Sequence, residues 1–188
     1  MKSEVIFKMN RAVFLDRDGT LNYDEGYTYK TMDFKLLPKV IPALNLLKKN
    51  FLLFIVTNQS GVARGYYSIE DVKNFNKIMI EEFSRENIYI KEIYICPHHD
   101  ADNCDCRKPS TKFIRAAEKN YNLDIKNSYV IGDHPSDIEM GNKAGCKTIY
   151  VLTGHGMKHI SDLNEKGIHP SLITNSLYDA ALWIAENE

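Results

Sequence analysis

The stretch AVFLDRDGT, residues 12–20, points to the fold because a short apolar run ends there at two carboxylates. Asp16 and Asp18 lie two residues apart, and Gly19 permits a tight backbone turn directly after them. Carboxylates this close repel each other unless a divalent cation neutralises them or one of them keeps a proton. Either condition suits phosphoryl transfer. Taken alone, the motif fits a solvated turn equally well.

Apolar runs like this one recur along the chain and alternate with amphipathic segments of helical length. Buried strands separated by helices are typical of an α/β fold, so we expect a doubly wound, Rossmann-like parallel sheet covered on both faces. Ser68, followed three residues later by Asp71, predicts a capped start for the longest helix. The expected strands cover 12–16, 51–57, 93–96, 128–133, 147–153 and 171–175, and the expected helices include 39–49, 68–86 and 109–121.

Length and composition indicate one domain spanning residues 1–188, because 188 residues with 44% hydrophobic content suffice for one core and are short for two. The formal net charge of −1 gives no general attraction to nucleic acid or to an anionic membrane, so we expect neither as a partner. The first ten residues, MKSEVIFKMN, fit neither a signal peptide nor a membrane span. We expect a cytoplasmic monomer.

Polar side chains gather where the predicted strands end, and in a doubly wound sheet these ends form the ligand site. The second strand leads into TNQS at 57–60, a run of hydroxyl and amide groups suited to phosphate oxygens. The fourth strand ends in GDHPSD at 132–137, which supplies another pair of carboxylates. Arg107 and Lys108 precede a predicted helix start, where the backbone amides also favour an anion.

This ordered set of motifs resembles the haloacid dehalogenase (HAD) superfamily: DxDGT, a strand-end threonine, a lysine before a helix, and GDxxxD. The resemblance spans residues 16–137 and implies a phosphatase in which Asp16 attacks phosphorus and forms an aspartyl-phosphate. Asp18 would protonate the leaving oxygen and later activate water. Thr57 would hold the phosphoryl oxygens, and Lys108 would neutralise charge on Asp16 and the phosphate.

The resemblance also implies a catalytic Mg²⁺. The carboxylates of Asp16 and Asp133 and the backbone carbonyl of Asp18 would bind it, since this hard cation prefers oxygen ligands. Asp137 is expected to orient its neighbours from outside the ligand shell. The segments between the motifs are too short for a cap domain, so we expect a capless fold with an open site.

A second metal site is predicted within CPHHDADNCDC, residues 96–106, which contains three thiols and two imidazoles. Three thiolates and one imidazole would complete a tetrahedral zinc site, and unliganded cytosolic thiols are the alternative. The pattern CPHH followed by CxCRKP resembles the HAD phosphatases that act on D-glycero-D-manno-heptose 1,7-bisphosphate and on histidinol phosphate. By that resemblance a structural Zn²⁺ is held by Cys96, His98, Cys104 and Cys106, and it fixes the loop that carries Arg107 and Lys108.

Two further stretches, LDRDGTLNYDEGY at 15–27 and VTNQSGVARGYYS at 56–68, are similar to the heptose-type enzymes. The resemblance implies removal of the 7-phosphate from a small bisphosphorylated sugar, in the synthesis of bacterial lipopolysaccharide or other surface-heptose precursors. Arg107 would bind the distal phosphate or the sugar. The other implied substrate contacts are Asp24, Glu25, Gly26 and Tyr27, for which a polar surface loop is the alternative, and Asn58, Gln59 and Ser60.

One position departs from the heptose-type pattern, because His134 stands where lysine is common, and we expect more pH-sensitive affinity for metal or phosphate. His155 and His159 receive no role. The runner-up activity is that of a histidinol-phosphate phosphatase. From a different class, a non-catalytic zinc-bearing scaffold is the alternative, although all four catalytic positions are filled.

Overall fold

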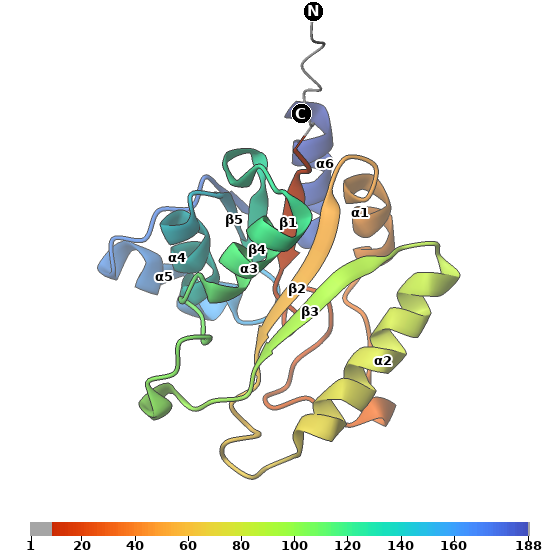
Figure 1. Cartoon of the computed structure of the whole chain (residues 1–188), viewed down its shortest axis with the longest axis vertical. Coiled ribbons are helices and arrows are strands. Elements are labelled where there is room, and N and C mark those ends of the chain that lie inside the picture. Colours follow the sequence, from red (N-terminus) through yellow and green to blue (C-terminus); the bar gives the residue numbers. More distant parts are fainter. Residues whose placement is uncertain (1–8, 188) are drawn as a thin grey trace, which may run out of the picture.

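The computed structural model describes residues 9–187 and is built around one six-stranded sheet (Figure 1). Every neighbouring pair of strands is parallel, and the spatial order is β3-β2-β1-β4-β5-β6. The order reverses between β1 and β4, which is the switch point where doubly wound sheets bind ligands. The strands are β1 (Ala12–Leu15), β2 (Leu52–Asn58), β3 (Ile90–Cys96), β4 (Tyr129–Gly132), β5 (Lys147–Val151) and β6 (Leu172–Thr174).

Helices cover both faces of this sheet, as the sequence predicts (Figure 1). Alternate strand residues point to opposite faces, so Phe14 and Leu15 belong to different cores. The core on the Leu15 side is closed by α1 (Val40–Leu47), α2 (Ile69–Arg85) and α6 (Leu177–Asn187). The opposite side is covered by α3 (Lys112–Tyr121), α4 (Pro135–Ala144) and α5 (Gly156–Glu165). Short 3-10 turns lie at Thr31–Asp33, Asp100–Asp102 and Ile125–Asn127.

Strand register brings the predicted polar segments to one edge of the sheet. Leu15, the last residue of β1, lies opposite Ile55 in β2 and Ile131 in β4. The residues that follow these three strands therefore emerge close together. The Asp16 backbone N–H continues the pairing with a 2.9 Å bond to the Ile131 carbonyl, which fixes the start of the DxDGT turn.

The elements predicted by residue range have boundaries within three residues of the structure, and the starts of β3 and α3 differ most, by three residues each. For β3 the reason is local. It begins at Ile90, whereas the sequence predicts only 93–96, because Lys91 and Glu92 interrupt the apolar run. An edge strand tolerates such charges, since one of its sides faces solvent. At the start of α2 the predicted cap is confirmed, because Ser68 and Asp71 exchange side-chain to backbone bonds of 3.1 and 2.8 Å.

The segments between the motifs carry no inserted domain in the part of the chain described. Residues 16–51 form a loop, a 3-10 turn and α1, and α2 with its flanking turns joins β2 to β3. Within residues 9–187 no helix is both long and apolar enough to cross a membrane. The interpretation of MKSEVIFKMN concerns mainly residues 1–8, which lie outside the described residues.

Candidate active site and metal centres

A cavity of about 220 Å³ lies at the carboxyl ends of β1, β2, β4 and β5. It brings together the strand-end motifs from five separate stretches of the chain. A larger cavity of about 610 Å³ lies along residues 23–35, but it contains none of the buried charged groups. The smaller one is the candidate site. Its lining residues are Asp16, Asp18, Asp24, Thr57, Asn58, Arg107, Lys108, Asp133, His134, Ser136 and His155.

Lys108 lies at the bottom of this cavity, almost fully buried. Its Nζ contacts Asp16 Oδ1 at 2.5 Å and Asp137 Oδ1 at 2.7 Å, and donates to the Val56 carbonyl at 3.0 Å. Burial opposes the charge on Lys108, but the two carboxylates outweigh it and raise the lysine pKa. Lys108 is therefore a fixed cation between two acids, and its backbone is held by a 3.1 Å bond from Lys108 N to Asn58 Oδ1.

Three buried carboxylates, those of Asp16, Asp133 and Asp137, have oxygen atoms within 4.8 Å of one another. Burial, together with the neighbouring carboxylates, raises the pKa of Asp16 to about 6 and that of Asp133 to about 9. One lysine is thus insufficient to balance the cluster, and a hard divalent cation would complete it. The donor set fits Mg²⁺, with Asp137 already engaged by Lys108 as the expected orienting group.

Gly19 explains how Asp133 comes so near the DxDGT turn. A Cβ atom at this glycine, whose φ is +81°, would lie 2.1 Å from Asp133 Oδ2. On the other side, the His155 backbone N–H donates to the same Oδ2 at 2.7 Å. The Asp133 carboxylate therefore packs between the loop that follows β1 and the loop that follows β5.

Asp18 differs from Asp16, because its carboxylate is surrounded by donors. Arg17, which is fully buried, donates to it from Nε and Nη2 at 2.8–3.1 Å and stacks on the Phe75 ring at 4.7 Å. Asn22 Nδ2 and Gln59 Nε2 add bonds of 3.0 and 2.7 Å, and Thr57 Oγ1 lies at 3.4 Å. These contacts fix the Asp18 side chain near Asp16.

Only some of the predicted substrate contacts line this cavity. Asp24 does, but its carboxylate accepts bonds from Gly26 N at 3.0 Å and Thr28 Oγ1 at 2.9 Å, and pairs with His155 Nε2 at 3.2 Å. Burial opposes ionisation of Asp24, yet these bonds hold its pKa below the usual value. Glu25, Gly26 and Tyr27 line the 610 Å³ cavity instead.

Of the three predicted substrate contacts that end β2 or follow it, only one lines the cavity. Asn58 lines the cavity, whereas Gln59 is buried and bonded to protein groups. Ser60 is half-buried, and its carbonyl accepts from Arg64 N. Arg107 reaches the cavity rim, where its guanidinium donates to the His98 carbonyl at 3.3 Å and lies 3.6 Å from the exposed Asp100.

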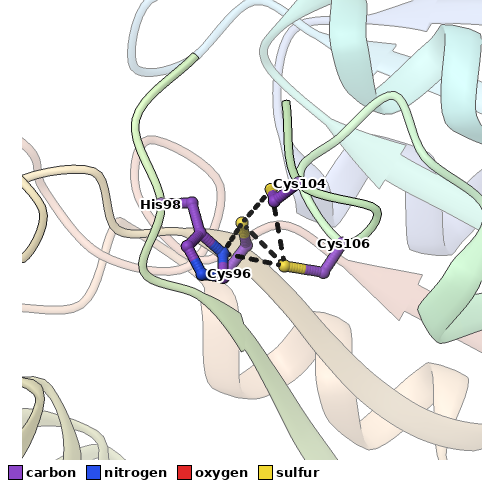
Figure 2. A group of neighbouring side chains, drawn as sticks. All are labelled: Cys96, His98, Cys104 and Cys106. Atoms are coloured by element: carbon purple, nitrogen blue, oxygen red, sulfur yellow. Dashed lines mark hydrogen bonds between the residues drawn. The ribbon is translucent and has the colours of Figure 1, made fainter. Parts of the chain in front are cut away.

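The four predicted zinc ligands converge in the loop after β3 (Figure 2). Cys96 Sγ lies 3.6 Å from Cys104 Sγ and 3.7 Å from His98 Nδ1, and Cys104 lies 3.7 Å from Cys106. Cys106 Sγ is closer to Cys96 Sγ, at 3.1 Å, and to His98 Nδ1, at 3.2 Å. These separations lie at or somewhat below those of tetrahedral ligands around one ion with bonds of about 2.0–2.3 Å. Burial opposes ionisation of Cys104, but the backbone N–H groups of Cys106 and Arg107 lower its pKa to about 7. The cluster could therefore hold a metal ion.

Two residues that line the cavity, Ser136 and His155, were assigned no part in catalysis or binding from the sequence, and a third, His134, was expected only to make metal or phosphate affinity more pH-sensitive. His155 directly follows Thr153 and Gly154 at the end of β5, so the strand-end rule applied to β5 would have found it. Burial, with His159 and Lys108 nearby, lowers the pKa of His134 to about 4. A shift in this direction favours the neutral imidazole, and the expected pH sensitivity of metal or phosphate affinity stays a prediction.

Comparison with known proteins agrees with this geometry. The HAD-hydrolase-like family model matches residues 105–180. The D-glycero-alpha-D-manno-heptose-1,7-bisphosphate 7-phosphatase of Campylobacter jejuni is 42% identical over 143 residues, which cover 76% of this chain and 82% of that protein. The D-glycero-beta-D-manno-heptose-1,7-bisphosphate 7-phosphatase of Haemophilus ducreyi is 39% identical over 183 residues, which cover 93% of this chain and 98% of that protein.

Among solved structures, the D,D-heptose 1,7-bisphosphate phosphatase from B. bronchiseptica, complexed with magnesium and phosphate, superposes with a TM-score of 0.86 at 26% identity. The match covers 95% of this chain and 99% of that one. With relatives this similar over most of their length, the chain belongs to the D-glycero-D-manno-heptose-1,7-bisphosphate 7-phosphatase family of HAD-like hydrolases.

Proposed function

We propose that this protein removes the 7-phosphate of D-glycero-D-manno-heptose 1,7-bisphosphate, in the synthesis of bacterial surface-heptose precursors. The observation that carries the proposal is the buried Lys108, held 2.5 Å from Asp16 at the bottom of a cavity that also contains Asp133. A carboxylate beside a fixed cation, at the switch point of a doubly wound sheet, suits nucleophilic attack on a phosphate.

Asp16 is the nucleophile in this proposal. Its carboxylate oxygen forms a bond to phosphorus while the ester P–O bond breaks, and Asp18 gives a proton to the departing sugar oxygen. Water then attacks the aspartyl-phosphate, Asp18 takes up a proton from that water, and the bond between Asp16 and phosphorus breaks. Thr57 and Lys108 bind the phosphoryl oxygens throughout, so most of the rate enhancement comes from positioning and electrostatics.

Mg²⁺ is the expected cofactor, held by the carboxylates of Asp16 and Asp133 and the backbone carbonyl of Asp18. When bound, it supplies positive charge that neutralises the phosphate and orients it toward the nucleophile. The raised pKa values of Asp16 and Asp133 support this assignment, because they mark a cluster with too little positive charge.

Zn²⁺ is the ion proposed for Cys96, His98, Cys104 and Cys106, since thiolate-rich sites favour it over hard cations. A closed set of three sulfurs and one nitrogen leaves no open position, so the role is structural. The bond from Arg107 to the His98 carbonyl supports a link between this loop and the cavity rim. Reduced thiols also favour a cytoplasmic location.

The substrate assignment follows from the relatives and from the shape of the site. The cavity lacks a cap in the described residues, and Arg107 at its rim is the proposed partner of the 1-phosphate. Asp24 and Asn58 are the further proposed substrate contacts. The described part of the chain builds the site without a second domain. A single domain over residues 1–188, acting as a monomer, completes the proposal.

Steady-state kinetics on a small substrate panel tests the proposal. The protein should cleave heptose 1,7-bisphosphate at the 7-position, in preference to histidinol phosphate and an aryl phosphate. Arg107→Ala should lower kcat/KM for the bisphosphate by about 30- to 1000-fold, the effect of losing a contact of about 2–4 kcal/mol, and affect the monophosphates far less. A preference for histidinol phosphate, or equal losses on every substrate, would show that the assignment is wrong.

A further inference from the structure

Gln59 is buried beneath the active site, although its place in the TNQS segment predicts a substrate contact. Only 2% of its surface is exposed, and the residue does not line the cavity. Its Nε2 donates to Asp18 Oδ2 at 2.7 Å and to Thr57 Oγ1 at 2.8 Å. Both amide protons therefore point at groups to which the mechanism assigns a role.

Tyr67 sets the orientation of the Gln59 amide. Its hydroxyl donates to Gln59 Oε1 at 2.8 Å. The carboxylate of Asp18 accepts but cannot donate when ionised, so the NH₂ end of the amide faces Asp18 while the oxygen end takes the Tyr67 proton. A flipped amide would place an oxygen against the Asp18 carboxylate.

The position of the Tyr67 ring is itself fixed by close packing. The ring stacks on Tyr29 with centroids 4.7 Å apart. Gly61 leaves the space that the ring occupies, because a Cβ atom there would lie 2.2 Å from Tyr67 Cε1. The backbone of Gln59 is anchored as well, by a 2.7 Å bond from its N–H to the Cys96 carbonyl at the end of β3.

We infer that Gln59, oriented by Tyr67, is a positioning residue for the Asp18 carboxyl group rather than a contact of the substrate. Arg17 bonds to both oxygens of that carboxylate, and the Gln59 amide adds the shortest of the other hydrogen bonds to it, so Gln59 helps to keep the carboxyl group aimed at the ester oxygen. The inference rests on the proposed role of Asp18 as acid and base, and it does not depend on which sugar is the substrate.

Leaving-group dependence separates this role from a general structural one. An alkyl phosphate releases a strongly basic alkoxide that needs a proton from Asp18, whereas an aryl phosphate with an acidic phenol leaves without one. Tyr67→Phe keeps the ring but removes the hydroxyl. We expect kcat/KM for the alkyl phosphate to fall about tenfold, and that for the aryl phosphate to stay within about twofold. Gln59→Leu should show the same selectivity with a larger loss.

Tyr94→Phe is the matched control, because it removes a tyrosine hydroxyl bonded to Glu92 on β3. It should leave both rates unchanged. Equal losses on the two phosphates in Tyr67→Phe and Gln59→Leu, or no loss in either, would overturn the inference. So would a Gln59→Leu effect confined to the KM for heptose bisphosphate. A wild-type protein that cleaves the aryl and alkyl phosphates but not heptose bisphosphate refutes only the proposed substrate, and one without phosphatase activity refutes both.

Discussion

Replacing Lys108 by methionine would test the charge balance of the site most severely. Methionine keeps the unbranched apolar stem and removes the only lysine that contacts Asp16 and Asp137 among the described residues. All three side chains are at least 90% buried, so water cannot take over the role of the cation. Breaking a buried ion pair from one side costs about 3–5 kcal/mol, because the remaining charges stay unpaired. We expect the metal-free variant to lose stability in that range.

Mg²⁺ should restore part of this loss, because a divalent cation can balance the same carboxylates. The assay is urea unfolding of wild type and Lys108→Met, with chelator and with saturating Mg²⁺, together with kcat/KM on an aryl phosphate. We expect a fall of at least about 100-fold in kcat/KM, since a positioned charge on the transferred phosphoryl group is lost. Lys143→Met, which removes an exposed partner of Glu139 on α4, is the control and should cost less than about 1 kcal/mol. A Lys108→Met protein as stable as wild type in chelator, with near-normal turnover, would refute the described charge balance.

Two further predictions concern the metals. Without a cation, burial raises the pKa of Asp16 to about 6 and of Asp133 to about 9, so the folded protein holds protons that the unfolded chain releases near pH 4. The contribution of these groups to stability therefore falls as pH rises from about 4 to about 9. Because the carboxylates are more fully ionised at high pH, Mg²⁺ should raise Tm more at about pH 8.5 than at about pH 6. Equal shifts in Tm at both pH values would contradict this prediction. Elemental analysis of the purified protein should find about one zinc per chain, and Cys104→Ser should lose that zinc and lower Tm. A protein without zinc, in which thiol titration finds all three loop cysteines reactive, would show that the metal assignment is wrong.

The sequence predicts the sheet and the strand-end groups because both depend on local signals. Continuous apolar runs place β1, β2 and β4, and parallel strands bring their carboxyl ends to one edge, so Asp16, Thr57 and Asp133 meet as expected. The cysteine and histidine spacing is equally local, and Cys96 to Cys106 converge as predicted. Ser68 caps α2 for the same reason.

Side-chain direction within loops is not a local property, and there the predictions from sequence diverge from the structure. Asn58 ends β2 and Gln59 follows it, and both side chains are amides. Only Asn58 lines the cavity, because the Gln59 amide turns into the interior and bonds to the Tyr67 hydroxyl. Tyr27 has a left-handed backbone, with a φ of 57°, and lines the neighbouring cavity together with Glu25. The position of His155 just after β5 predicts that it lies near the site, but its pairing with Asp24, 131 residues away, is a tertiary contact that the sequence does not indicate.

The most direct test of the central claim is to trap the phosphoryl group on the protein. Asp18→Asn cannot activate water, but an aryl phosphate still transfers its phosphoryl group, because its leaving group needs no proton. Acid-quenched Asp18→Asn, analysed by peptide mass spectrometry after reaction with Mg²⁺ and the aryl phosphate, should carry one phosphoryl group on Asp16. Asp16→Asn treated in the same way should carry none and release no phosphate. An unmodified Asp16 in Asp18→Asn, together with phosphate release by Asp16→Asn near the wild-type rate, would contradict covalent catalysis at this residue.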